Sequence, residues 1–181
     1  MVPTLAATLG VKGHRPTVGT RDCKDLLYLL GVVNLVTAAV HSNTLESPKD
    51  AKKRTGKAKT RRLQEAFAAH LRHLGRVYPR ERSPRVVLVI DNASWHRGKP
   101  IDEALGDHPH LEFKRLPSYS PQLNPIERFW KKLRRRATHN RLFDTLADLK
   151  ASLRASLCYF QTMRPKVKSI LEGRPRKKAV K

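Results

Sequence analysis

One short segment constrains the fold more than any other part of the chain. The run Arg85-Val-Val-Leu-Val-Ile90 is unbroken and rich in β-branched residues, with Pro84 before it and Asp91 after it. Such a run, bounded by turn residues, is typical of a central strand that is buried on both faces. Because helical patterns lie on either side of this strand, we predict an α/β or α+β domain built around a sheet.

The segments around this strand predict the remaining elements. A helix begins at Leu63, where apolar residues recur at helical spacing, and Gly75 and Pro79 end it. Apolar runs of the earlier part predict two adjacent buried strands, although run length alone does not exclude a helix there. The other expected elements are a loop over 1–25, strands over 26–35, 37–40 and 111–116, a helix over 100–106, a Pro-rich loop over 117–125, a helix from 125 and a final helix from 144.

The chain is long enough for one compact domain with a hydrophobic core. Its 181 residues show no internal repeat. We expect residues 1–172 to form this domain. The basic segment 173–181 is expected to be a disordered tail.

Charge points to a polyanionic partner. Lys and Arg number 38 against 15 Asp and Glu, a formal net charge of +23. Such an excess opposes folding by self-repulsion, so nucleic acid is the leading partner. A ribosomal or chromatin protein would share this bias. The densest basic stretch, residues 49–62, is either a solvated mobile loop or an arm that contacts phosphates through Lys52, Lys53 and Arg54.

Cysteine usage and hydropathy indicate the compartment. Cys23 and Cys158 are far apart and belong to no CxxC pattern, which argues against a disulfide scaffold or a structural zinc site. No apolar stretch reaches the length of a membrane span, and the N-terminus has no signal-peptide pattern. We therefore expect a soluble, cytoplasmic protein.

Two acidic residues are candidates for chemistry. Asp91 stands at the C-terminal end of the central strand, where functional groups gather in open α/β sheets, although an ordinary turn aspartate has the same place. Glu127 is expected in the first turn of a helix with Asn124 as N-cap and Pro125 at the first position. A capping box is an equally good explanation of Glu127 taken alone.

Two ordered motifs carry a family resemblance. The first is Val89-Ile-Asp91-Asn-Ala-Ser-Trp-His96, and the second is Leu116-Pro-Ser-Tyr-Ser-Pro-Gln-Leu-Asn-Pro-Ile-Glu127-Arg-Phe-Trp130. With 35 residues between Asp91 and Glu127, this pair strongly resembles the DDE transposases of bacterial insertion sequences related to mariner elements. The resemblance runs from Val11 to Ile170, and two motifs of this length in this order are very specific.

The resemblance implies a ribonuclease-H-like fold, a mixed five-stranded sheet flanked by helices. It also implies metal-dependent DNA cleavage and strand transfer with two Mg²⁺ (or Mn²⁺) ions held by three carboxylates. Asp91 and Glu127 match the second and third of these acids. One metal activates the attacking hydroxyl and the other stabilises the leaving oxygen. Asn92, His96 and Asn124 are expected as active-site neighbours, although a hydrogen bond at a helix start explains His96 equally well.

The first aspartate of the family has no counterpart. Aligning residues 3–16 places it several residues before Met1, so the resemblance implies an incomplete first strand and an N-terminally truncated chain. The expected partners are DNA, as element ends and target, a second copy in a homodimer, and an upstream polypeptide carrying the helix-turn-helix region. A catalytically inactive remnant that only binds DNA remains the alternative.

Six bases follow Glu127 on the predicted helix. A solvated face would explain them, but their place beside a candidate catalytic acid favours contact with the DNA backbone. They are Arg128, Lys131, Lys132, Arg134, Arg135 and Arg136.

Overall fold

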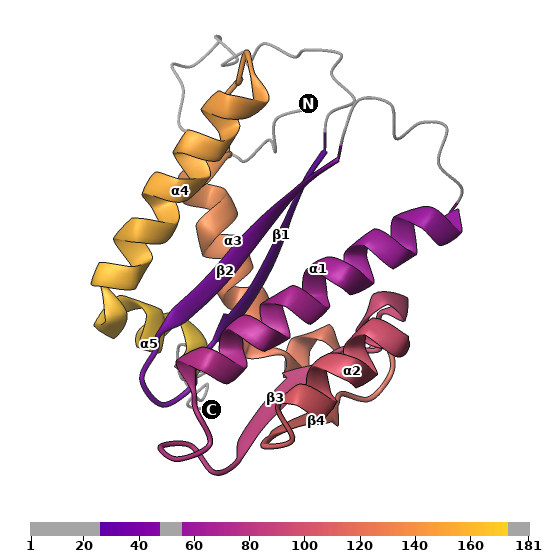
Figure 1. Ribbon diagram of the computed structural model, residues 1–181. Helices are drawn as coiled ribbons and strands as arrows, with labels where there is room; N and C mark the ends of the chain where they lie inside the picture. The colour runs from indigo at the N-terminus through magenta and orange to yellow at the C-terminus, as the bar shows by residue number, and fades with distance from the viewer. Residues whose placement is uncertain (1–25, 48–55, 174–181) are drawn as a thin grey trace, which may run out of the picture. The chain divides into compact units, whose positions relative to one another are not determined.

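The computed structural model describes residues 26–47 and 56–173 (Figure 1). These residues belong to two compact units. The sheet unit comprises residues 28–32 and 41–124, and the helical unit comprises the remaining described residues, 26–27, 33–40 and 125–173. The predicted loop over 1–25, the bases Lys52, Lys53 and Arg54, and the tail beyond residue 173 lie outside the described residues.

Strands and helices alternate along most of the chain. The elements are β1 (Leu26–Val33), β2 (Val40–Ser47), α1 (Gly56–Val77), β3 (Val86–Ile90), the 3-10 helix η2 (Ser94–His96), α2 (Lys99–Asp107), β4 (Leu111–Arg115), the 3-10 helix η3 (Pro121–Leu123), α3 (Pro125–Ala137), α4 (Leu146–Thr162) and α5 (Arg164–Glu172). The predicted positions of β3, α2, β4 and α3 are confirmed to within a residue or two. None of the described helices has both the length and the apolar character that crossing a membrane requires.

The first two strands form a two-stranded sheet. A strand over 37–40 was the wrong prediction, because the chain turns after Asn34 and β2 begins only at Val40. The Asn34 side-chain Oδ1 accepts the backbone N–H groups of Val36 and Thr37, each at 2.9 Å. This side chain therefore replaces the strand's hydrogen bonds with those of a turn.

The core of the sheet unit lies along one face of α1. Phe67, Leu71 and Leu74 of this helix are buried together with Ile101 of α2 and Leu88 of β3. The helix begins at Gly56, so the second half of the basic segment expected as a loop is helical. Arg and Lys are good helix formers, and this basic turn lies on the solvent side of an amphipathic helix.

β3 and β4 pair in parallel, with Val86 opposite Leu111 and Ile90 opposite Arg115. Burial of β3 on both faces was the wrong prediction. Leu88 and Ile90 face the core, whereas the alternate residues Val87 and Val89 are 49% and 40% exposed. The described strands thus form two two-stranded sheets instead of one continuous five-stranded sheet, within the expected α/β class.

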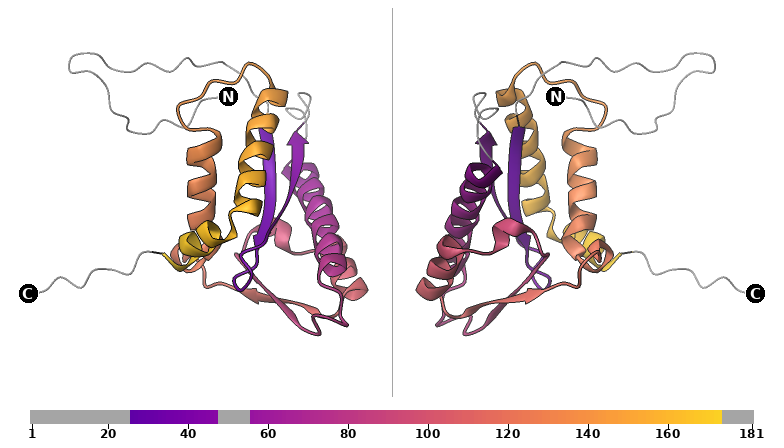
Figure 2. Two further views of the ribbon diagram at one scale, coloured as in Figure 1. Left: turned by 90° about the vertical axis from the view of Figure 1, so that its left-hand side faces the viewer. Right: turned by 90° about the vertical axis from the view of Figure 1, so that its right-hand side faces the viewer.

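The helical unit packs α3 and α4 side by side, and α5 lies against α3, as Figure 2 shows. Phe129 of α3 is fully buried, and its ring meets that of Phe160 on α4 at a centroid distance of 5.2 Å. α4 starts in a capping box formed by Thr145 and Asp148. Instead of being the final helix, α4 ends at Thr162, because a proline opens α5 within its first two positions.

Candidate active site and nucleic-acid interface

Asp91 follows directly after β3 and is the centre of a small polar arrangement. Its Oδ1 accepts the backbone N–H of Ala93 at 3.0 Å and lies 2.9 Å from Nδ1 of His96. The side chain is nevertheless 60% exposed. Both of these contacts involve Oδ1. Asp91 therefore does act as a turn aspartate, as the sequence allowed, but this role uses only one of its two carboxylate oxygens. Oδ2 has no recorded contact among the described residues and is available to a ligand.

His96 lies on η2, and its ring contacts the carboxylate of Asp91. Its side chain is 14% exposed and its ring packs against that of Phe67, with centroids 4.5 Å apart. Burial lowers the pKa of His96, and this effect outweighs the opposite influence of Asp91. The imidazole is therefore neutral at pH 7. Because a carboxylate oxygen only accepts hydrogen bonds, the proton lies on Nδ1 and is donated to Asp91.

The start of the second motif lies beside the first. Asn92 donates its side-chain Nδ2–H to the carbonyl oxygen of Leu116 at 2.8 Å, and the Leu116 N–H donates to the Ile90 carbonyl at 2.9 Å. Arg115 adds a hydrogen bond from Nη2 to the His96 carbonyl at 2.9 Å. The ends of β3 and β4 are therefore tied together at the point where both motifs begin. Sequence reasoning did not single out Arg115, for which only its place at the end of a strand was a signal.

Beyond Leu116 the second motif exposes an aromatic side chain. Tyr119 has a positive φ of 56°, and its side chain is almost fully exposed. A non-glycine residue in this region of backbone space is uncommon and is frequent at functional sites. Asn124, at the end of the loop, is half-buried and immediately precedes α3, as expected.

Glu127 lies in the first turn of α3 and is half-buried. It belongs to the helical unit, whereas Asp91, Asn92, His96 and Asn124 belong to the sheet unit. No hydrogen bond or ion pair of the Glu127 carboxylate is recorded among the described residues. Nor do residues 26–47 and 56–173 contain a group of three or more His, Cys, Asp or Glu side chains that could hold a metal ion. The candidate ligands are therefore one carboxylate in each unit.

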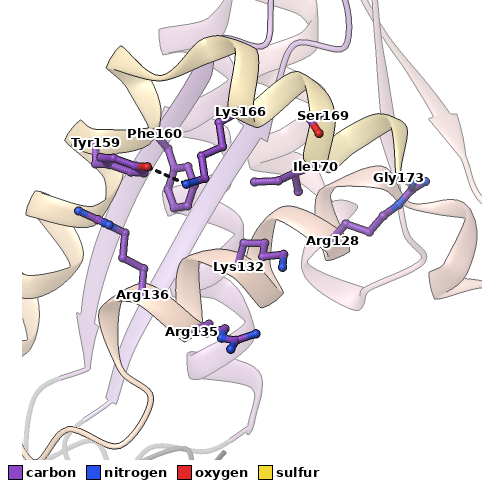
Figure 3. Close-up of a pocket in the computed structure, with 10 residues that line it drawn as sticks. All are labelled: Arg128, Lys132, Arg135, Arg136, Tyr159, Phe160, Lys166, Ser169, Ile170 and Gly173. Atoms are coloured by element: carbon purple, nitrogen blue, oxygen red, sulfur yellow. Dashed lines mark hydrogen bonds between the residues drawn. The ribbon is translucent and has the colours of Figure 1, made fainter. Parts of the chain in front are cut away.

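The six bases of α3 do not all face the same way. Four of them line a pocket of about 890 Å³ in the helical unit, and Figure 3 shows how they lie. Lys131 and Arg134, at intervening positions of the same helix, do not line it. The residues of the pocket are Arg128, Lys132, Arg135 and Arg136 of α3, Tyr159 and Phe160 of α4, Lys166, Ser169 and Ile170 of α5, and Gly173.

Tyr159 and Lys166 are residues of this pocket that sequence reasoning missed. Lys166 donates from Nζ to the Tyr159 hydroxyl at 2.8 Å, and the Arg136 guanidinium carbon lies 3.7 Å from the centre of the tyrosine ring. The hydrogen bond from Lys166 lowers the pKa of Tyr159. Lys166 lies on a helix that was not predicted, so its neighbours were not accessible from the sequence.

Comparisons with known proteins identify the family of this chain. The model of the DDE superfamily endonuclease family matches residues 7–150. The chain is 26% identical over 152 residues, 84% of its length, to the insertion element IS630 39 kDa protein of Shigella sonnei. It is 32% identical over 85 residues, 47% of its length, to the protein y4pE/y4sA of Sinorhizobium fredii. The matched regions span 40% and 58% of these two relatives.

Solved structures show the same fold. The match to the crystal structure of the Mos1 mariner paired-end complex with Mn covers 94% of this chain and 50% of the Mos1 chain, with a TM-score of 0.58 and 18% identity. The Mos1 transposase complex with the left transposon end gives a TM-score of 0.57, also with 18% identity, and covers 94% of this chain and 49% of its own. The expected ribonuclease-H-like fold is thus confirmed. The chain belongs to the DDE superfamily endonuclease family.

Proposed function

We propose that this chain is the catalytic core of a transposase that cleaves and joins DNA strands with divalent metal ions. The observation that carries this proposal is the arrangement at the end of β3. There, Asp91 is held by the neutral ring of His96 while one carboxylate oxygen stays open to solvent. An acidic group that is oriented by a neighbour and exposed at the end of a strand is what a metal ligand requires.

Asp91 and Glu127 are the proposed metal ligands. Carboxylate oxygens are the hard donors that Mg²⁺ and Mn²⁺ prefer, and Oδ2 of Asp91 has no recorded contact among the described residues. Divalent metal use is supported by family membership, and one of the Mos1 structures contains Mn. When bound, such ions activate a hydroxyl for in-line attack on phosphorus and stabilise the leaving oxygen.

His96 and Asn92 are proposed as positioning residues. His96 restrains the rotation of the Asp91 carboxylate by donating from Nδ1 to Oδ1. Asn92 fixes the loop by its hydrogen bond to Leu116. Asn124 precedes Glu127 in the same motif and is proposed as a further neighbour of the site. Because these side chains are already held in place, each unit needs little rearrangement when ligands bind.

The partner that follows from this proposal is DNA, as element ends and as target. This is supported by the net charge of +23 and by the Mos1 complexes, which contain paired ends or a transposon end. A homodimer and a separate polypeptide with a helix-turn-helix region complete the proposed assembly. The match to the insertion element IS630 protein covers 84% of this chain but only 40% of that protein, which is therefore the longer of the two.

A DNA-binding protein without cleavage activity is the second candidate. The observation in its favour is that residues 26–47 and 56–173 contain no group of three metal-binding side chains. Two carboxylates bind a metal ion less tightly than three, and the two-metal arrangement depends on shared ligands.

A nicking assay separates the two candidates. DNA carrying terminal inverted repeats is incubated with the chain and Mg²⁺ or Mn²⁺, in parallel with Asp91→Ala, Glu127→Ala and the control Asp102→Ala. Asp102 is an exposed acid on α2, and its side chain makes no hydrogen bond or ion pair within the described residues, so its removal changes charge but not the site. Metal-dependent nicking that only the first two substitutions abolish supports the catalytic proposal. Salt-sensitive binding without nicking by the parent chain supports the second candidate instead.

A further inference from the structure

The pocket of the helical unit is a concentrated basic site. Five of its ten lining residues are Lys or Arg, and none is acidic. No ion pair is recorded between these five bases and an acid in the described part of the chain. Like charges one helical turn apart destabilise a helix by a few tenths of a kcal/mol per pair. An anion between the bases therefore stabilises the helix that carries them.

Helical spacing gathers these bases on one face of α3. Arg128, Lys132, Arg135 and Arg136 stand at relative positions 0, 4, 7 and 8, which is one stripe of a helix with 3.6 residues per turn. From the first to the last of them the helix rises about 12 Å, comparable with the axial rise of about three base pairs of a duplex at 3.4 Å each. Lys166, from α5, supplies a base on the other wall.

Tyr159 lies between the two walls and is covered by cations. Arg136 stacks on the ring at 3.7 Å from its centre, and Lys166 binds the hydroxyl at 2.8 Å and lies 5.3 Å from the ring centre. Figure 3 shows both side chains directed at the ring. Because cations occupy the ring, it organises the bases and does not serve as a platform for nucleobases. The groups left for a ligand are guanidinium and ammonium donors, which bind anionic oxygens.

Gly173 makes room for the base at the end of the pocket. Its φ is +74°, and a Cβ at this position would come within 2.5 Å of Nη1 of Arg128. Arg128 therefore reaches over the backbone at Gly173, directly after α5, as Figure 3 shows. A glycine here serves both the backbone conformation and the close approach of the guanidinium.

We infer that this pocket binds a run of consecutive phosphates of a nucleic-acid backbone, without reading bases. The inference rests on the proposed function for its occupant, because DNA is the phosphodiester that transposition supplies. It goes beyond that proposal in dividing the six bases of α3 into four that hold the strand and two, Lys131 and Arg134, that do not. It also adds Lys166, and Tyr159 as a positioning residue.

A salt titration with matched variants tests the inference. Binding of a labelled 30-bp DNA duplex to the chain is followed by fluorescence anisotropy in EDTA, at several salt concentrations. Lys132→Ala/Arg135→Ala removes two charges inside the pocket, and Lys131→Ala/Arg134→Ala removes two from the same helix outside it. The pocket variant should bind at least tenfold more weakly, with a slope of log K against log salt smaller by about 1.8. The control should change the affinity less than twofold and keep the slope. Equal effects of the two variants would overturn the inference.

Lys166→Gln provides a second, independent measurement, because it lies on α5 and leaves α3 intact. It should reduce the salt slope by about 0.9, and an unchanged slope would contradict the proposed second wall. Two duplexes of unrelated sequence should bind equally, whereas a strong sequence preference would contradict a site that reads no bases. Tighter binding of an RNA duplex would contradict DNA as the occupant.

The result is independent of catalysis. EDTA removes metal ions, so the pocket is tested even if the chain never nicks DNA. Asp102→Ala, which lies outside both the pocket and the proposed active site, should bind DNA with the parent's salt slope. Nicking by a chain whose pocket variant binds like the parent would refute the pocket and leave the proposed function intact.

Discussion

Lowering the pH from 7.5 to 5 is expected to destabilise this chain mainly through His70 of α1. Its side chain has no exposed surface, and neither ring nitrogen has a hydrogen-bond partner among residues 26–47 and 56–173. Burial, and then the neighbouring His73 and His41, lower the pKa of His70 from 6.5 to about 4. The folded chain therefore keeps this imidazole neutral over a range in which the unfolded chain protonates it.

The sign and size of the effect follow from this difference. Below pH 6.5 the unfolded state binds a proton that the folded state excludes until about pH 4, so stability falls as the pH falls. A pKa of about 4 in the folded state corresponds to a loss of about 2 kcal/mol at pH 5, rising to about 3.4 kcal/mol well below pH 4. The lowered pKa of His96 contributes a loss of the same sign.

Urea unfolding, followed by circular dichroism at both pH values, measures this loss. His70→Leu places an apolar side chain of similar volume in the core, and this side chain does not bind a proton. The variant should lose about 2 kcal/mol less than the parent between pH 7.5 and pH 5. Equal losses in parent and variant would refute the reasoning, because they would place the acid sensitivity elsewhere.

Substitutions at three further positions test the packing, the helix cap and the proposed site. Phe129→Ala should cost about 3–5 kcal/mol in urea unfolding, because the ring is fully buried against Phe160, and a cost below 1 kcal/mol would contradict that packing. Thr145→Ala should lower stability by about 1 kcal/mol through loss of the capping box, whereas Thr145→Ser should retain most of it. His96→Gln should weaken Mn²⁺ binding about 10-fold or more by releasing Asp91, and unchanged Mn²⁺ affinity would argue against a positioning role.

The elements that sequence reasoning predicted well have strong local signals. The β-branched run of β3 and the Asn-Pro start of α3 each determine structure over a few residues. The errors arise where a single side chain, or a segment distant in the sequence, determines the local structure. Asn34 turns the chain where an apolar run continues. The exposure of Val87 and Val89 depends on which face of β3 the helices cover, which a run of apolar residues does not encode.

The candidate site was predictable as motifs but not as geometry. Motif spacing and residue type are enough to single out Asp91, His96 and Glu127. That His96 holds Oδ1 of Asp91 depends on burial against Phe67, which lies 29 positions earlier in the chain. The partition of the α3 bases likewise depends on α5, a short helix that was not predicted because its few apolar residues follow a proline directly after α4.

Iron-directed backbone cleavage tests whether Asp91 and Glu127 hold the same metal ion, because it reports which segments surround one bound ion. Fe²⁺ replaces Mg²⁺ in the chain, peroxide and ascorbate generate radicals, and mass spectrometry maps the cuts. If both carboxylates hold one ion, cuts are expected beside both Asp91 and Glu127, suppressed by excess Mg²⁺ and lost in Asp91→Asn/Glu127→Gln. Cuts beside only one of the two residues, or cuts that survive the double substitution, would contradict a shared ion.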